Sequence, residues 1–212
     1  MIDGVLSMGR RVGLTQQAVV AAAARIADED GLEAVSMAAV AERLGVRSPS
    51  LYAHVDGLAG LHRRLTILAA TALADELRAS RHRRHGAVAL QALANAYRAF
   101  ASNHPGWYAA AQQAVPPGKD DALYRTLAES VLPVMETLAE MGVPPADLLH
   151  QTRAVRSALH GFVTLERGNS FGMSVDFDES FQRLVELVTR GVVGPPATSL
   201  RTAPGSTAAS RP

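Results

Sequence analysis

The sequence predicts an all-α protein with an N-terminal three-helix unit, a C-terminal helical bundle and about nine helices. Of its 212 residues, 48% are hydrophobic but only 5% are aromatic, so the core must be built from alanine, leucine and valine. Apolar residues recur at steps of three and four in successive segments, which is the spacing of helices and not of strands. Clusters of proline and glycine separate these periodic segments.

The expected helices follow these breaks in order. The first begins at a Thr15 cap and runs to Asp30, where Gly31 ends it. A longer helix starts after Asp56 and Gly57 and should leave the first unit to enter the second. The further helices are expected at residues 85–103, 105–114, 120–141, 146–167 and 177–192.

Residues 36–55 predict a helix-turn-helix. Ser36 can cap a short amphipathic helix, and Gly45 suits the left-handed turn that ends it. Ser48 and Pro49 then start a second helix, because proline fits the first helical position. In a helix-turn-helix this second helix lies in the major groove of DNA. An ordinary helical hairpin with a solvated outer face is the alternative.

Residues 15–62 resemble the N-terminal domain of the TetR-type (tetracycline-repressor family) transcriptional regulators. The resemblance is carried by the Thr15 helix start, Gly31-Leu32-Glu33-Ala34-Val35-Ser36, Val40-Ala41-Glu42-Arg43-Leu44-Gly45-Val46 and Ser48-Pro49-Ser50-Leu51-Tyr52-Ala53-His54-Val55. The second half resembles one subgroup of effector domains, marked by a tryptophan and a His-Gly pair. Here these are Trp107 and His160-Gly161.

The resemblance implies roles in DNA binding for matching positions. Phosphate contacts are implied for Ser36, Tyr52 and His54, and contacts with base edges for Ser48, Pro49 and Ser50.

Two positions depart from the family pattern. Asp56-Gly57-Leu58 stands where family members often have a lysine that binds phosphate. Ala38 stands where a base-reading arginine can occur. Base reading is therefore expected from Arg47, whose planar guanidinium fits guanine O6 and N7.

The second half is expected to bind a small molecule. The candidate ligand-binding residues are Trp107, Tyr108, His160 and Phe162. The alternative is that the aromatic residues are simply core. Internal charge is sparse, which favours an apolar or amphipathic effector in an apolar pocket with a few polar groups.

The last two helices are expected to form a homodimer interface, because their apolar stripes exceed what one small bundle can cover. The expected interface residues are Val155, Leu159, Phe181, Leu184 and Val188. A two-fold dimer would hold two recognition helices ~34–36 Å apart and so bind a palindromic operator. The alternative is that both stripes face their own subunit's core.

Four parts of the chain are expected: a flexible basic arm at 1–14, the DNA-binding domain at 15–62, the effector-binding and dimerisation domain at 63–193, and a disordered tail at 194–212. The basic run at 78–85 is interpreted as a solvated connection between helices and not as a second nucleic-acid patch. Arginines and acids are equal in number over residues 1–64, so charge alone does not indicate DNA binding.

Several classes are disfavoured. The chain has no cysteine, which suits a cytoplasmic protein, and no apolar run reaches the roughly 18–20 residues that span a membrane. Residues 1–14 lack the apolar segment of a signal peptide. The nearest approach to a metal motif is Asp147-x-x-His150, so no metal, cofactor or catalytic residue is expected. A ligand-responsive repressor is the favoured function; a sequence-tolerant architectural DNA-binding protein and, less so, a helical-bundle enzyme are the alternatives.

Overall fold

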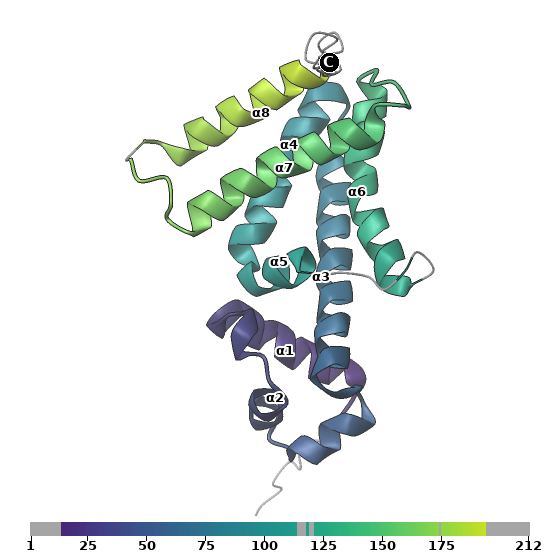
Figure 1. The fold of residues 1–212 in the computed structure, drawn as a ribbon, viewed down its shortest axis with the longest axis vertical. Helices are drawn as coiled ribbons and strands as arrows, with labels where there is room; N and C mark the ends of the chain where they lie inside the picture. Colours follow the sequence, from purple (N-terminus) through teal and green to yellow (C-terminus); the bar gives the residue numbers. More distant parts are fainter. Residues whose placement is uncertain (1–13, 114–117, 119–120, 174, 194–212) are drawn as a thin grey trace, which may run out of the picture.

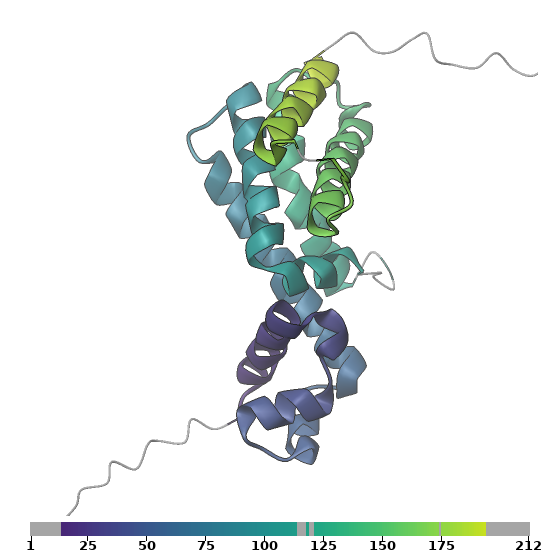
Figure 2. The same ribbon diagram turned by 90° about the vertical axis from the view of Figure 1, so that its left-hand side faces the viewer.

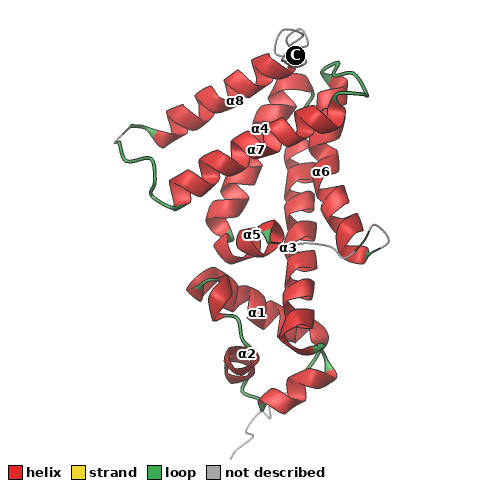
Figure 3. Cartoon of the chain, viewed as in Figure 1, coloured by secondary structure: helices red, strands yellow, loops and turns green. Residues whose placement is uncertain are grey.

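The structure is a computed structural model that describes residues 14–113, 118, 121–173 and 175–193. All regular secondary structure in these residues is helical, which confirms the predicted all-α class (Figure 3). The α-helices are α1 (Gln16–Asp30), α2 (Met37–Leu44), α3 (Gly57–Arg81), α4 (Gly86–Asn103), α5 (Pro105–Gln112), α6 (Ala122–Glu140), α7 (Leu148–Arg167) and α8 (Phe177–Val193). Two 3-10 helices, η1 (Leu32–Ala34) and η2 (Ser48–Ala53), lie in the N-terminal part. The expected basic arm, apart from Leu14, and the expected tail lie outside the described residues.

The predicted caps fix the start of the first two α-helices. The side-chain oxygen of Thr15 accepts a 3.1 Å hydrogen bond from the backbone N–H of Ala18, and that of Ser36 accepts one of 3.1 Å from Ala39. Gly45 ends α2 in the left-handed conformation, with φ 65° and ψ 32°. Each cap satisfies one of the free backbone N–H groups at the start of its helix, and both helices begin where the sequence predicts.

The second helix of the motif differs in type from the expectation. It is a 3-10 helix of six residues, in which the N–H of Ser50 donates to the carbonyl of Arg47 at 2.9 Å. Pro49 lies in its first turn, and Gly57, with φ +66°, follows closely after its end. Six residues are long for a 3-10 helix, and at its end the N–H of Val55 also makes an α-type hydrogen bond to the carbonyl of Leu51 at 3.1 Å.

Helix α3 connects two hydrophobic clusters (Figure 1). Its first half contributes Leu61 and Leu65 to the cluster of the N-terminal unit. Its second half contributes Leu73 and Leu77 to the core of the bundle. Figure 2 shows the N-terminal helices as a lobe below the bundle, with α3 running into both. One continuous helix therefore belongs to both parts of the chain. The expected domain boundary at residue 62 stays a prediction.

The bundle places α4 and α6 against α3, and α7 and α8 side by side on the outside (Figures 1 and 2). The basic run is divided: α3 extends through Arg81, and residues 82–85 form an exposed connection, as interpreted from the sequence. Arg81 pairs with Glu140 and, at 2.6 Å, with Glu136 of α6. None of the described helices combines the length and the apolar character needed to cross a bilayer.

Candidate nucleic-acid interface and internal cavity

The 3-10 helix η2 shows a buried side and an exposed side. Leu51 and Val55, which are 0% and 2% exposed, anchor the segment in the N-terminal cluster. Arg47, Ser50 and Tyr52 are exposed, and Tyr52 keeps 60% of its surface accessible. Pro49 is exposed and Ser48 half-buried beside them. An aromatic side chain this exposed, next to an arginine and hydroxyl groups, suits contact with a polar partner such as a phosphate backbone.

The backbone after η2 is held in place by the two neighbouring helices. The side-chain amide N–H of Gln16 donates to the backbone carbonyl of His54 at 2.9 Å. The amide oxygen of Gln16 accepts a hydrogen bond from Arg64 of α3 at 2.9 Å. His54 itself is half-buried, as is Ser36, whose oxygen is engaged in capping α2. The predicted DNA-binding residues thus stand on a fixed backbone, although their individual contacts with DNA stay predictions.

Acidic residues at the end of α1 are engaged by other parts of the chain. Glu29 accepts a 2.6 Å hydrogen bond from Arg43 of α2, and this hydrogen bond holds the pKa of Glu29 below its ordinary value. Asp28 points instead toward α5. Its carboxylate accepts hydrogen bonds from the backbone N–H groups of Gly106 at 2.8 Å and Trp107 at 3.2 Å. The acidic cluster therefore carries structural contacts between elements.

Helix α5 packs closely on α1. A Cβ atom at Gly106 would come within 2.1 Å of the backbone carbonyl carbon and oxygen of Ala27, so only glycine allows this approach. The indole N–H of Trp107 donates to the carbonyl of Ala24 at 3.1 Å. The Trp107 ring stacks on His104 and touches both hydrophobic clusters. Trp107 therefore packs between the N-terminal unit and the bundle and contacts both.

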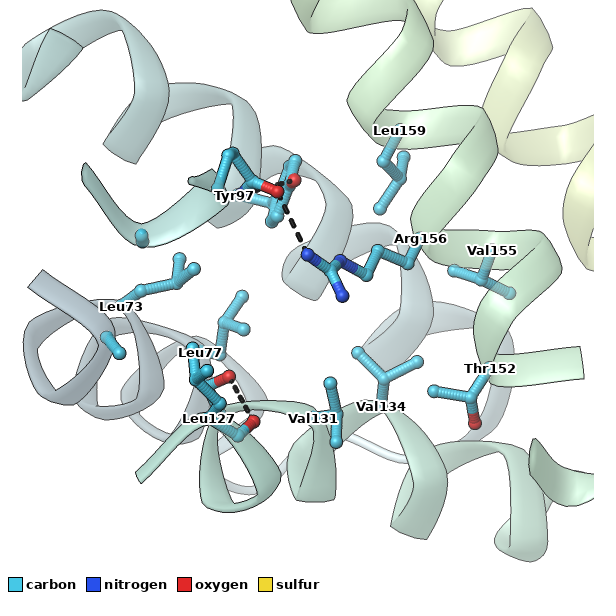
Figure 4. A pocket seen from close by; sticks show the side chains of 14 residues that line it. Leu73, Leu77, Tyr97, Leu127, Val131, Val134, Thr152, Val155, Arg156 and Leu159 are labelled. Atoms are coloured by element: carbon cyan, nitrogen blue, oxygen red, sulfur yellow. Dashed lines mark hydrogen bonds between the residues drawn. The ribbon is translucent and has the colours of Figure 1, made fainter. Parts of the chain in front are cut away.

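The bundle contains a partly open cavity of about 130 Å³ (Figure 4). Apolar side chains form most of its wall: Ala70, Leu73, Leu77, Ala111, Leu127, Val131, Val134, Val155 and Leu159. The polar lining residues are Tyr97, Gln112, Ser130, Thr152 and Arg156. Arg156 is the one charged residue among these lining residues, and it reaches toward Tyr97 (Figure 4). An apolar chamber with a few convergent polar groups is typical of a small-molecule site.

A chain of hydrogen bonds leads away from the cavity. Arg156 donates to the amide oxygen of Gln112 at 2.9 Å and also contacts the hydroxyl of Tyr97. The hydroxyls of Tyr97 and Tyr108 lie 3.0 Å apart, and that of Tyr108 lies 2.5 Å from Nδ1 of His160. Burial raises the pKa of both tyrosines, and burial together with Arg156 lowers the pKa of His160. Both phenols thus keep their protons, and a neutral His160 can accept from Tyr108.

The predicted ligand-binding residues lie outside the lining of this cavity. Tyr108 contacts the lining residue Tyr97 and is itself hydrogen-bonded to His160, so neither Tyr108 nor His160 lines the cavity. Trp107 packs on α1 and donates to the carbonyl of Ala24. Phe162 packs on Phe171 and Phe181, with ring centroids 5.0 and 5.1 Å away.

Gln112 and Arg156, the polar lining residues that face each other, were not among the residues predicted to bind a ligand. A signal was present, because Thr152, Arg156 and His160 form a polar row at steps of four on α7.

Three expected dimer residues require correction. Val155, Leu159 and Phe181 are 1%, 4% and 1% exposed, and all three belong to the core of their own subunit. They therefore have almost no surface left for a second copy. Leu184 and Val188 are half-buried against that core. Both helices do have an apolar stripe, but the three most buried residues of these stripes pack in the core of their own subunit. This is the alternative that the sequence left open.

In the described part of the chain, no group of three or more His, Asp or Glu side chains lies close enough to hold an ion. Asp147 is the residue that precedes the first turn of α7, and His150 is exposed.

Comparisons with known proteins agree with the geometry. Residues 19–56 match the profile of the bacterial regulatory proteins of the tetR family, and residues 90–188 match that of the tetracyclin repressor-like C-terminal domain. The chain is 36% identical over 187 residues to YobS of Bacillus subtilis (strain 168), an HTH-type transcriptional regulator, covering 88% of this chain and 96% of YobS.

Solved structures show the same architecture. The regulatory protein SCO4313 superposes with a TM-score of 0.67 at 26% identity, covering 82% of this chain and 94% of that one. ActR of Streptomyces coelicolor, in its complex with (S)-DNPA, gives a TM-score of 0.61 at 18% identity, covering 85% and 97%, and shares the fold. The curated relatives are described as HTH-type transcriptional regulators. From its helix-turn-helix, its bundle and these matches, the chain belongs to the TetR family of bacterial transcriptional regulators.

Proposed function

We propose that the chain is a homodimeric repressor that binds a palindromic operator and leaves it when a small apolar or amphipathic molecule enters the cavity. The observation that carries this proposal is the position of α5. Gly106 and Trp107 at its first end are bonded to α1, and Ala111 and Gln112 at its other end line the cavity. One short helix thus links the space for a ligand to the DNA-binding unit.

On the DNA side, the exposed row on η2 supports operator reading. Arg47 precedes the first turn of η2 and is exposed, so its guanidinium can reach a guanine edge in the major groove. Tyr52 and Ser50 are exposed nearby for phosphates and bases. A single six-residue segment contacts few bases, which is why two copies on adjacent major grooves are needed for a specific site.

For the dimer, we propose the outer flank of α7 and α8. Leu165 and Leu187 are 44% and 65% exposed, so each of the two helices presents an apolar side chain that a second copy could cover. Gly161 and Gly191 have no atom within 4 Å of a Cβ built on them, so a partner helix could approach there. The two helices lie side by side on the outside (Figure 2), and two such pairs would form a four-helix interface.

The switch is proposed to act through two states of α5 and α3. A ligand that displaces Ala111 and Gln112 would move Gly106, which cannot shift without pushing against Ala27. The DNA-binding unit would then turn relative to the bundle, and the two recognition segments would no longer match adjacent grooves. A coupling free energy of ~1–3 kcal/mol, about 5–150-fold in operator affinity, would be enough for regulation.

In-vitro selection of bound DNA, followed by a compound screen for release from the selected site, tests the proposal. We expect enrichment of a palindrome and at least one small molecule that releases it. Trp107→Phe, which keeps a ring but loses the hydrogen bond to Ala24, should impair release while operator binding without ligand survives. Equal binding of selected and random DNA would instead indicate an architectural protein.

A further inference from the structure

The polar end of the cavity has an unusual charge arrangement. Arg156 is the one cation in the lining, and the partners that the structure gives it, Gln112 and Tyr97, are neutral. No acidic side chain of the described residues forms an ion pair with it. By contrast, Arg63, Arg81 and Arg98 each pair with a carboxylate from another part of the chain. Arg156 is thus a cation held by dipoles and open to an anion.

The geometry also defines what kind of anion fits. A guanidinium has five N–H donors in a planar fork that matches a carboxylate with two parallel hydrogen bonds. Arg156 is exposed, so its charge is partly hydrated before a ligand arrives and folding does not bury it unpaired. A second negative charge on the ligand would find no second cation in the lining, where the remaining polar residues, Ser130 and Thr152, are neutral and most side chains are apolar. The site therefore suits a monoanion.

The size of the cavity sets the body of the ligand. Its volume is about 130 Å³. An apolar protein cavity of about 150 Å³ holds a benzene molecule. A single ring or a short branched chain fits this space, and a long acyl chain does not fit without expansion of the bundle.

We propose that the cavity binds small monocarboxylates with a compact apolar body, with the carboxylate paired to Arg156 between Tyr97 and Gln112. This rests on the proposed function and specifies the effector class. The bound carboxylate would compete with Gln112 for Arg156 and pull on the end of α5, which connects the ligand's charge to the DNA-binding unit. Tyr97 borders the same end of the pocket, but its hydroxyl proton goes to Tyr108 when Tyr108 donates to His160, so Arg156 supplies the charged donors for the carboxylate.

The test uses the full chain and three probes of similar shape: benzoate, neutral benzamide and cationic benzylamine, titrated by calorimetry at pH 7.5. We expect benzoate to bind at least about tenfold more tightly than benzamide, which is a difference of ~1.4 kcal/mol. Benzylamine should not bind. Arg156→Gln should reduce the affinity for benzoate to that for benzamide, and Arg156→Lys should retain part of it because it keeps the charge without the fork.

The matched control is Arg153→Gln, an exposed arginine on the same helix that does not line the cavity. It should bind benzoate like the native chain. Helical circular dichroism and the unfolding midpoint verify that each variant is folded. Equal affinity for benzoate and benzamide, no binding of any probe, or a loss in Arg153→Gln as large as in Arg156→Gln would overturn the assignment.

Operator binding, followed by fluorescence anisotropy on the same preparations, separates this proposal from the proposed function. Release of the operator by neutral compounds alone would leave the repressor intact and refute the carboxylate site. Arg156-dependent binding of benzoate without any effect on operator affinity would support the site and refute the release mechanism.

Discussion

The carboxylate of Asp28, near the end of α1, accepts a 2.8 Å hydrogen bond from the backbone N–H of Gly106, the second residue of α5. An acid at the first turn of a helix satisfies free N–H groups and matches the helix dipole. Here the acid belongs to the DNA-binding unit and the helix to the bundle. The contact therefore caps α5 and also connects the N-terminal unit to the bundle.

Gly106→Ala should disrupt this contact between α1 and α5. The added Cβ would lie 2.1 Å from the Ala27 carbonyl, which is backbone and cannot rotate away. We expect a loss of about 1–3 kcal/mol in the free energy of unfolding, as for other overpacked sites, measured by urea denaturation. Gly118→Ala is the control, because nothing lies within 4 Å of its Cβ. Equal stability of both variants would show that α5 does not press on α1.

Arg47→Ala and Tyr52→Phe should affect DNA binding in different ways. If Arg47 reads a guanine, its loss should cost about 1–3 kcal/mol and relax the preference at one position of each half-site. Tyr52→Phe should weaken binding evenly across sequences, because a phosphate contact positions the protein without reading bases. Anisotropy with the selected site and single-base variants distinguishes the two. Unchanged affinity and preference in Arg47→Ala would remove the base-reading assignment.

Leu165→Glu together with Leu187→Glu should give monomers in sedimentation velocity, with operator affinity lost although η2 is unchanged. The charges would stand on the outer flank of α7 and α8, where they disturb an interface but not the core. Leu132→Glu on α6, where the native leucine is similarly exposed at 42%, serves as the matched control and should remain dimeric. A double variant that stays dimeric and binds the operator would place the interface elsewhere.

Protonation of His160 should destabilise the chain at low pH. Burial is the main cause of its lowered pKa, and Arg156 adds to it. In the unfolded chain a histidine has its ordinary pKa near 6.5. Between that value and the lowered one the unfolded state binds more protons, so the free energy of unfolding must fall as the pH falls below about 6.5.

Urea denaturation at pH 7.5 and 5.5 measures this effect. His160→Gln, which can still accept from Tyr108, should lose less stability between the two pH values than the native chain. His82→Gln, an exposed histidine on the connection after α3, should behave like the native chain. A native-like pH dependence in His160→Gln would show that His160 does not titrate differently on folding.

The elements that the sequence predicted well are those defined by local interactions. The caps at Thr15 and Ser36 and the turn at Gly45 are set within four residues of chain, so they can be recognised without tertiary contacts. The tertiary roles of Val155 and Trp107 could not be recognised in this way. Which side of α7 faces the cavity, the core or a second copy depends on how α7 packs against α4, α6 and α8. An apolar stripe has the same pattern in all three cases.

The residues that line the cavity could not be predicted for the same reason, because the lining depends on how the helices pack. Tyr108 and His160 were singled out together, and they are in fact hydrogen-bonded. Yet the residues that face the open space are Tyr97, Gln112 and Arg156, because α5 turns Gln112 inward and places Tyr108 behind it. A polar residue in an apolar row was a visible signal, but the sequence does not say whether that residue faces solvent or a cavity.

The reciprocal effect of operator and ligand tests the central claim most directly. The dissociation constant of a releasing compound should be measured for the free protein and for the operator-bound protein. If the cavity and η2 are coupled, the operator must weaken compound binding by the same factor by which the compound weakens operator binding, about 5–150-fold. Val134→Phe, which fills the cavity, should abolish both effects while operator binding persists. A compound that binds free and operator-bound protein equally, or that still releases DNA from Val134→Phe, would contradict the account.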